Sequence, residues 1–247
     1  MAEFGTDAVA PTQPFQGLDP EKIIATAEAL RCRISERFPD SGLSRLAREL
    51  QETARRTAET ARRLATPILW LRALVVLCSA LAVAAFVGTL FFLQGETRVF
   101  SSVAEFFQGL DAFINELVFV GLALLFLFTV ENRIKRSRAL KSLYLLRSLA
   151  HIVDMHQLTK SPERVAGGGT DTPSSPKRVL TPFELTRYLD YCSEMLALLS
   201  KLAALHAQHF NDPVTLDAVN DVENLTQGLA RTSWQKIMIL DRVDSAG

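Results

Sequence analysis

Hydrophobic residues along the chain form two uninterrupted blocks and several periodic segments. The first block, residues 73–93, holds 21 residues without a charge. A helix rises about 1.5 Å per residue, so a block of this length covers the roughly 30 Å of hydrocarbon in a bilayer. A buried core helix of a soluble protein is the alternative interpretation. We predict a transmembrane helix over residues 67–94.

The second block, residues 117–130, has only 14 charge-free residues, a length that core helices and re-entrant segments share. Eleven of the 14 are Leu, Val or Phe, and residues 112–114 extend the apolar run outward past Asn115 and Glu116. A carboxylate near the edge of a span costs less than the roughly 3 kcal/mol expected at the bilayer centre. We predict a second transmembrane helix over residues 112–131.

Cationic residues flank both blocks on the same side. Seven arginines lie in residues 45–72 and six Lys or Arg without any acid in residues 133–147, whereas residues 95–116 carry one Arg against four acids. The positive-inside rule then places both termini in the cytoplasm and the connector, residues 95–111, outside. We expect a multi-pass protein of the cell (inner) membrane. The predicted membrane-interface anchors are Trp70, Arg72, Arg133, Lys135 and Arg136.

Helix starts outside the apolar blocks follow one rule. Asp19-Pro20, Thr181-Pro182 and Asp212-Pro213 each place a capping side chain before a proline, whose missing N–H costs nothing at the first helical position. The predicted segments are a disordered start (1–18), N-terminal helices (19–66), a helical extension of the second span (132–158), a flexible linker (159–180), a helical hairpin (181–241) and a frayed tail (242–247). Residues 103–116 are amphipathic, and they either lie along the outer leaflet or extend the second span.

A seven-residue repeat marks the hairpin as the best-patterned soluble segment. Heptad spacing kept over residues 185–206, about six helical turns, implies packing against partner helices, either within the chain or in another copy. The predicted helix-packing residues are Leu185, Leu189, Cys192, Leu196, Leu199 and His206. The fold class that we predict is all-α: an integral membrane protein with a two-helix transmembrane hairpin and a cytoplasmic helical bundle.

Composition removes several classes of function. The 27 Lys and Arg balance 27 Asp and Glu, which argues against a nucleic-acid binder. The three cysteines, at positions 32, 78 and 192, lack CxxC spacing, and no nucleophile-elbow, P-loop or HExxH motif occurs. We therefore expect no cofactor and no enzymatic activity.

The four histidines occur in two pairs, each close to an aspartate. If two such groups faced one another in a bundle core, they could hold a metal. The residues concerned are His151, Asp154, His156, His206 and His209. Positions 151 and 156 are about 140° apart around a helix, which favours the alternative of ordinary structural histidines.

Polar residues at the outer end of the second block suggest another site. In an oligomer, Asp111, Asn115 and Glu116 could form a ring at the mouth of a cation pore. The alternative is that these residues end the helix in water.

Four strings of the sequence resemble segments of uncharacterised bacterial membrane proteins with two spans: RISERFPDSGL (33–43), HIVDMHQLTKSPE (151–163), TPFELTRYLDYCSEML (181–196) and SWQKIMIL (233–240). In architecture alone the chain is also similar to SLATT-type modules, two-span proteins thought to form pores in bacterial conflict systems. The resemblance implies a two-span membrane protein, and it implies no activity, ligand or site residue.

These patterns give three hypotheses of function. The first is a non-enzymatic, membrane-anchored scaffold or adaptor that forms homo-oligomers and contacts a cytoplasmic protein partner. The second is an oligomeric pore or ion-conducting effector, and the third is a metal-binding helical membrane protein.

Overall fold

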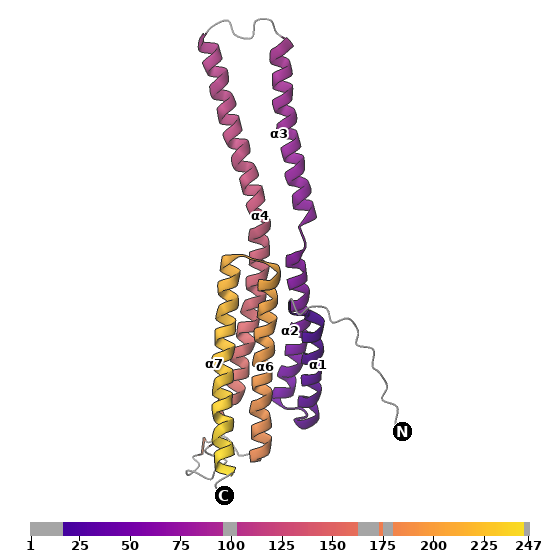
Figure 1. Ribbon diagram of the computed structural model, residues 1–247, viewed down its shortest axis with the longest axis vertical. Helices are drawn as coiled ribbons and strands as arrows, with labels where there is room; N and C mark the ends of the chain where they lie inside the picture. Colours follow the sequence, from indigo (N-terminus) through magenta and orange to yellow (C-terminus); the bar gives the residue numbers. More distant parts are fainter. Residues whose placement is uncertain (1–16, 96–102, 163–172, 175–179, 245–247) are drawn as a thin grey trace, which may run out of the picture. The chain divides into compact units, whose positions relative to one another are not determined.

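The computed structural model describes residues 17–95, 103–162, 173–174 and 180–244, and every regular element in these ranges is a helix (Figure 1). The helices are α1 (Pro20–Arg37), α2 (Gly42–Ala65), α3 (Leu69–Gly95), α4 (Val103–Leu158), α6 (Pro182–His209) and α7 (Pro213–Asp244). The all-α class is therefore confirmed. Most of the predicted disordered start and flexible linker lies outside the described ranges. Residues 242–244 of the predicted frayed tail belong to α7, and residues 245–247 lie outside the described ranges.

Side chains cap the three helices whose starts the sequence predicted. Asp19 Oδ1 accepts a hydrogen bond from the Glu21 amide at 2.9 Å. Thr181 and Glu184 form a reciprocal capping box, and Asp212 Oδ2 accepts from the Thr215 amide at 3.0 Å. Each such cap typically stabilises its helix by about 1 kcal/mol, because it satisfies an amide that has no partner within the helix.

The α1–α2 turn brings α2 close to α4. Asp40 adopts a positive φ of 56°, and Ser41 Oγ accepts from the Ser44 amide, so α2 begins at Gly42. A Cβ on Gly42 would lie 2.6 Å from Cε1 of His156. Only glycine allows the start of α2 to approach the α4 imidazole this closely.

The chain divides into two compact units, and the first comprises Met1–Ala61 and Ser142–Gly247. Its described part is a helical bundle around α6, of whose 28 residues 14 are buried. The helices α6 and α7 form an antiparallel hairpin, and α1 packs on α6 (Figure 1). The second half of α4 adds Leu143, Leu146 and Val153 to the same core, and α2 adds Leu43 and Leu50.

The second unit, Arg62–Lys141, contains α3 and the apolar half of α4. Thr66-Pro67 stands at the predicted boundary between residues 19–66 and 67–94, and the helix is interrupted there: α2 ends at Ala65 and α3 begins at Leu69. Both helices are long and apolar enough to cross a membrane. Large apolar side chains on both are exposed, Val76 by 67 % and Phe119 by 73 %.

The connector between the two apolar helices is shorter than we predicted. We predicted a connector over residues 95–111, but α4 begins at Val103 and continues to Leu158 as one helix of 56 residues. No proline interrupts this stretch, so a helix once started propagates along it. Residues 103–116 therefore belong to the same helix as the second apolar block, and residues 96–102 lie outside the described ranges.

Candidate functional site

The predicted packing residues of α6 are all inside the bundle. Leu185 is 3 % exposed, and the other five, Leu189, Cys192, Leu196, Leu199 and His206, are 0 % exposed. Leu185 and Leu189 pack with Ile237 and Leu240 of α7, and Cys192, Leu196 and Leu199 join the main core. The sequence left open whether this face packs on helices of the same chain or of another copy. The chain's own helices cover it. It is not available to another copy.

Burial has changed the chemistry of two groups on this face. Desolvation raises the pKa of the Cys192 thiol to about 12, so the thiol stays protonated and unreactive. Burial lowers the pKa of His206 despite hydrogen bonds to backbone carbonyls, because the charged imidazolium loses its water. His206 Nδ1 lies 3.3 Å from the Leu202 carbonyl oxygen, and its Nε2 has no partner in the described residues.

The structure does not assemble the metal site that the histidines suggested. His151 is exposed on α4, whereas His156, five residues on, lies beside the Tyr188 hydroxyl at 3.5 Å. Asp154 accepts a hydrogen bond from Gln157, and His209 is half-buried at the end of α6. Among the residues that the structure describes, no three His, Cys, Asp or Glu side chains are grouped to hold a metal ion. Two histidines five positions apart on one helix cannot share a face, and the helix packing offers no second set of ligands.

A polar cluster that the sequence analysis missed closes the end of α4. Gln157 and Ser233 are fully buried, and Ser233 Oγ donates to Gln157 Oε1 at 2.5 Å. Lys236 Nζ donates to the Gln157 carbonyl oxygen at 2.7 Å, and the Tyr188 hydroxyl donates to the His156 carbonyl oxygen at 3.4 Å. Side chains of α6 and α7 thus donate to carbonyls in the last turn of α4, where the Gln157 carbonyl oxygen also accepts from the Lys160 amide at 3.1 Å. The sequence signal for this cluster is Ser233, a polar residue that lies four residues after Leu229 and four before Ile237, in the row of apolar positions along α7.

Burial also acts on the ionisable members of this cluster. It lowers the pKa of Lys236, and the nearby Asp154 carboxylate opposes that shift. Burial raises the pKa of the Tyr188 phenol. The Tyr188 phenol keeps its proton at neutral pH, and both groups donate hydrogen bonds to carbonyls of α4, which fits a structural role in joining α4 to the α6–α7 hairpin.

Within the second unit, a carboxylate joins the two apolar helices. Glu131 of α4 accepts from the Ile68 amide at 3.3 Å, from Arg72 Nε at 3.3 Å and from Lys135 Nζ at 3.0 Å. Its side chain is only 15 % exposed. Glu131 therefore caps the start of α3 from a neighbouring helix, where the helix dipole favours a negative charge. The sequence analysis did not select it.

The predicted interface anchors differ in their surroundings. Trp70 and Arg133 are exposed, Arg136 is half-buried, and Arg72 and Lys135 both pair with Glu131. The two paired cations come from the start of α3 and from the α4 segment after the apolar block. The pairs therefore bring those two ends of the apolar helices together in one unit.

The predicted pore-mouth residues lie in the N-terminal quarter of α4. Asp111 and Asn115 are exposed, and Asn115 Nδ2 lies 3.5 Å from Asp111 Oδ2. The side chain of Glu116 lies outside the described part of the chain. The contact between Asp111 and Asn115 is an ordinary one between residues four apart on a helix face.

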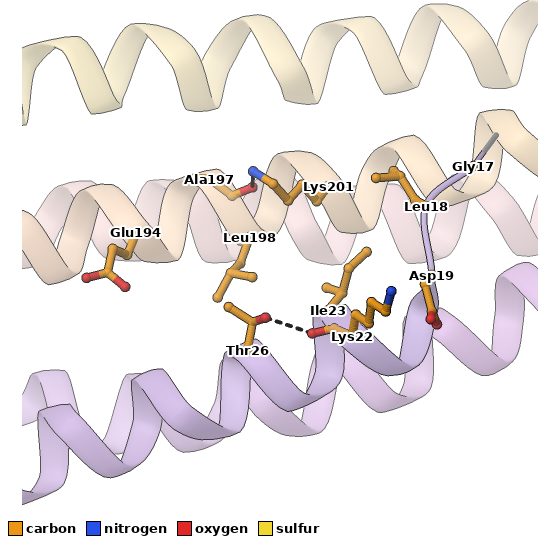
Figure 2. A pocket seen from close by; sticks show the side chains of 10 residues that line it. All are labelled: Gly17, Leu18, Asp19, Lys22, Ile23, Thr26, Glu194, Ala197, Leu198 and Lys201. Atoms are coloured by element: carbon orange, nitrogen blue, oxygen red, sulfur yellow. Dashed lines mark hydrogen bonds between the residues drawn. The ribbon is translucent and has the colours of Figure 1, made fainter. Parts of the chain in front are cut away.

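A groove of about 380 Å³ lies between the start of α1 and α6 (Figure 2). Ile23 and Leu198 give it apolar walls, and Lys22 and Lys201 bring two ammonium groups. Its two acids are engaged, because Asp19 caps α1 and Glu194 binds Arg33. The groove therefore combines apolar walls with positive charge, but the described residues hold no buried polar group aimed into it, and we assign it no ligand.

The comparisons with protein-family models, with curated proteins and with solved structures find no match for this chain. The resemblance to two-span bacterial membrane proteins stays a prediction from short strings of sequence.

Proposed function

We propose that this protein is a membrane-anchored, homo-oligomeric scaffold or adaptor without enzymatic activity. In this proposal α3 and the apolar half of α4 cross the bilayer of the cell membrane, and the helical bundle lies in the cytoplasm. One observation carries it: the apolar side chains of these helices are exposed. Of the two 18-residue apolar windows in the described residues, one is 11 % buried and the other has no buried residue. The core helix of a soluble protein would bury such side chains.

The length of α4 supports a second span. The charge-free block of 14 residues is too short by itself, since about 20 are needed to cross the hydrocarbon. Because α4 is helical from Val103, residues 112–131 form a continuous helical stretch of the required length. Its backbone hydrogen bonds are satisfied within the helix, as lipid demands.

Charge supports the proposed orientation. Arg72 and Lys135 converge on Glu131, so the cation-rich ends of the two apolar helices lie at one end of their unit. A helical hairpin with both cationic ends on one side is the arrangement that the positive-inside rule places with those ends in the cytoplasm.

The scaffold role is supported by how the bundle uses its polar groups. Gln157, Ser233 and Lys236 hold α4 against α7, and Tyr188 holds it against α6. These side chains stabilise helix packing. The bundle is thus suited to presenting a fixed surface to another protein.

Reporter fusions test the proposal. A phosphatase that is active only outside the cytoplasm, inserted within residues 96–102, should be active, and a fluorescent protein at the C-terminus should fluoresce. Insertion of the same phosphatase at Asn211, between α6 and α7, is the matched control and should be inactive. Activity at both phosphatase positions, or at neither, would contradict the proposed topology.

An ion-conducting assembly is the second candidate function. The specific observation is that Asp111 and Asn115 are exposed together one turn apart on α4, near the proposed outer end of the span. In several copies these oxygens would form a ring that attracts cations. We expect D111N to lower cation conductance in reconstituted bilayers, with D221N in the exposed part of α7 as control. Silent bilayers that contain correctly inserted protein would contradict this candidate.

A further inference from the structure

The half of α4 that lies in the bundle has two apolar faces, and only one of them is packed. Leu143, Leu146, Leu149 and Val153 are at most 4 % exposed and belong to the core. The opposite face remains open. It carries Tyr144, Leu145, Ile152, Met155 and Leu158, which are 64, 39, 38, 66 and 63 % exposed. We call these five residues the outer face of α4.

The spacing of the outer face is that of a coiled-coil seam. Leu145 and Ile152 are seven residues apart, and Tyr144 and Leu158 are fourteen apart. Met155 lies three residues after Ile152 and three before Leu158. Ser148 and His151, both exposed, complete the row. At about 100° per residue these positions share one side of the helix.

The charge along this face limits what can cover it. Between Tyr144 and Leu158 the row contains no Asp, Glu, Lys or Arg, and Lys141, one turn before Leu145, marks its limit toward the apolar half of α4. In a symmetric parallel pair each residue meets its own counterpart, so a charged residue in the row would repel itself. An uncharged row bounded by a cation is compatible with self-pairing that begins after Lys141.

The area of the face favours a second copy over a freely diffusing partner. Fifteen helical residues span about 22 Å, so a face roughly 10 Å wide offers on the order of 200 Å². Stable complexes between free proteins bury about 800 Å² on each partner. Two copies anchored in one membrane need less, because the anchor has already brought them together and given them the same orientation.

We propose that the outer face of α4 is a self-association surface on which two copies of this chain pair in parallel and in register. This inference rests on the proposed membrane anchoring, which makes the α4 helices of two copies leave the bilayer on the same side. It assigns the homo-oligomer contact to α4, since the α6 row is buried within each chain.

Disulfide crosslinking of the full-length protein in native membrane vesicles tests the pairing. The half-buried Cys32 and Cys78 are first replaced by Ser and Ala, and the buried Cys192 is kept. In this background M155C should form a disulfide-linked dimer on mild oxidation, at least fivefold more than M238C. Met238, which is 54 % exposed on α7, is the matched control.

A second variant separates pairing from folding. I152D should reduce crosslinking through S148C at least fivefold, because two aspartates would face one another in the pair. Its thermal unfolding should match that of M238D, since both changed side chains are exposed. Equal crosslinking of M155C and M238C, undiminished crosslinking in I152D, or a product that joins M155C to another protein would each overturn the proposal.

Membrane insertion is measured on the same vesicles by extraction at alkaline pH. If the protein resists extraction but M155C does not crosslink, the self-association surface is wrong and the anchoring stands. If the protein is extracted, the proposed anchoring fails, and the inference that rests on it fails as well.

Discussion

The two units of this chain use the same apolar residue types in opposite ways. In the bundle, α6 places its leucines inside, where Leu189, Leu196 and Leu199 are fully buried. In the other unit, α3 and α4 leave Leu81, Leu122 and Leu125 about 60 % exposed. Leucine in the bundle is stabilised by leaving water for protein, whereas leucine on these helices needs a different apolar surrounding. The comparison teaches that hydrophobicity alone does not tell a buried core helix from a candidate membrane span, and that the packing around the helix separates the two.

The largest expected effect separates the two kinds of leucine. L196A should lower the free energy of unfolding of the bundle by about 2–5 kcal/mol, because it leaves a cavity in a close-packed core. L125A, at an exposed position of α4, should change it by less than about 0.5 kcal/mol. Denaturant unfolding followed by circular dichroism measures both. Equal losses would mean that the apolar helices are packed in a protein core.

A charge placed on an apolar helix tests the same difference through membrane insertion. L81R should weaken membrane insertion by about 3 kcal/mol, the cost of Arg near the centre of a span. V214R, at an exposed position of α7, should leave insertion unchanged. Alkaline extraction of vesicles gives the inserted fraction. An inserted fraction of L81R equal to that of V214R would show that this part of α3 is surrounded by water and not by lipid.

The contact between the apolar helices should yield a smaller effect. E131A removes the carboxylate that pairs with Lys135 and leaves the Ile68 amide without its acceptor, which should cost about 1–3 kcal/mol. E131Q keeps an acceptor for that amide and should lose less. Hydrogen exchange of the amides at Ile68 and Arg72 reports the opening of the α3 start. Unchanged exchange in E131A would remove the structural role that we give to Glu131.

The smallest effect is a pH dependence confined to the bundle. Because burial lowers the pKa of His206, the unfolded chain takes up a proton near pH 6.5 while native His206 stays neutral. Stability is therefore complete above that pH and falls as the pH drops toward the native pKa, by at most about 1.4 kcal/mol per pH unit for this one proton. H206L should flatten the thermal unfolding profile between pH 7.5 and 5.5. The pKa of His156 is lowered as well, so a shallower slope should remain, and a profile unchanged by H206L would contradict the assignment.

Much of the fold was predictable because its signals are local. Asp19, Thr181 and Asp212 each stand before a proline, and the helices begin there because capping and proline geometry act within one turn. The break after Ala65 follows from Thr66-Pro67 in the same way. The row at Leu185–His206 correctly predicted a packed face. Which helix packs on this face was not predictable, because a heptad repeat indicates that a partner helix exists but does not identify that helix.

The candidate sites were predicted less well, because they depend on side chains far apart in the sequence. Gln157 meets Ser233 and Lys236 across more than 70 positions, and Glu131 meets the start of α3 across about 60. The histidine pairs suggested a metal site by proximity in sequence, but the helix turns His151 away from His156. Proximity along a helix and proximity in space are different quantities, and only packing decides the second.

The sequence by itself determined the all-helical class, the helix starts and the presence of two long apolar helices, because propensity, capping and charge-free length act over short stretches. The tertiary structure alone decided that α6 is the centre of its own bundle, that Glu131 joins α3 to α4, and that α4 keeps one apolar face open. The physical reason is that burial is a property of neighbours: a leucine in the α6 row and one on the outer face of α4 follow the same pattern in sequence. They differ only in which helices surround them.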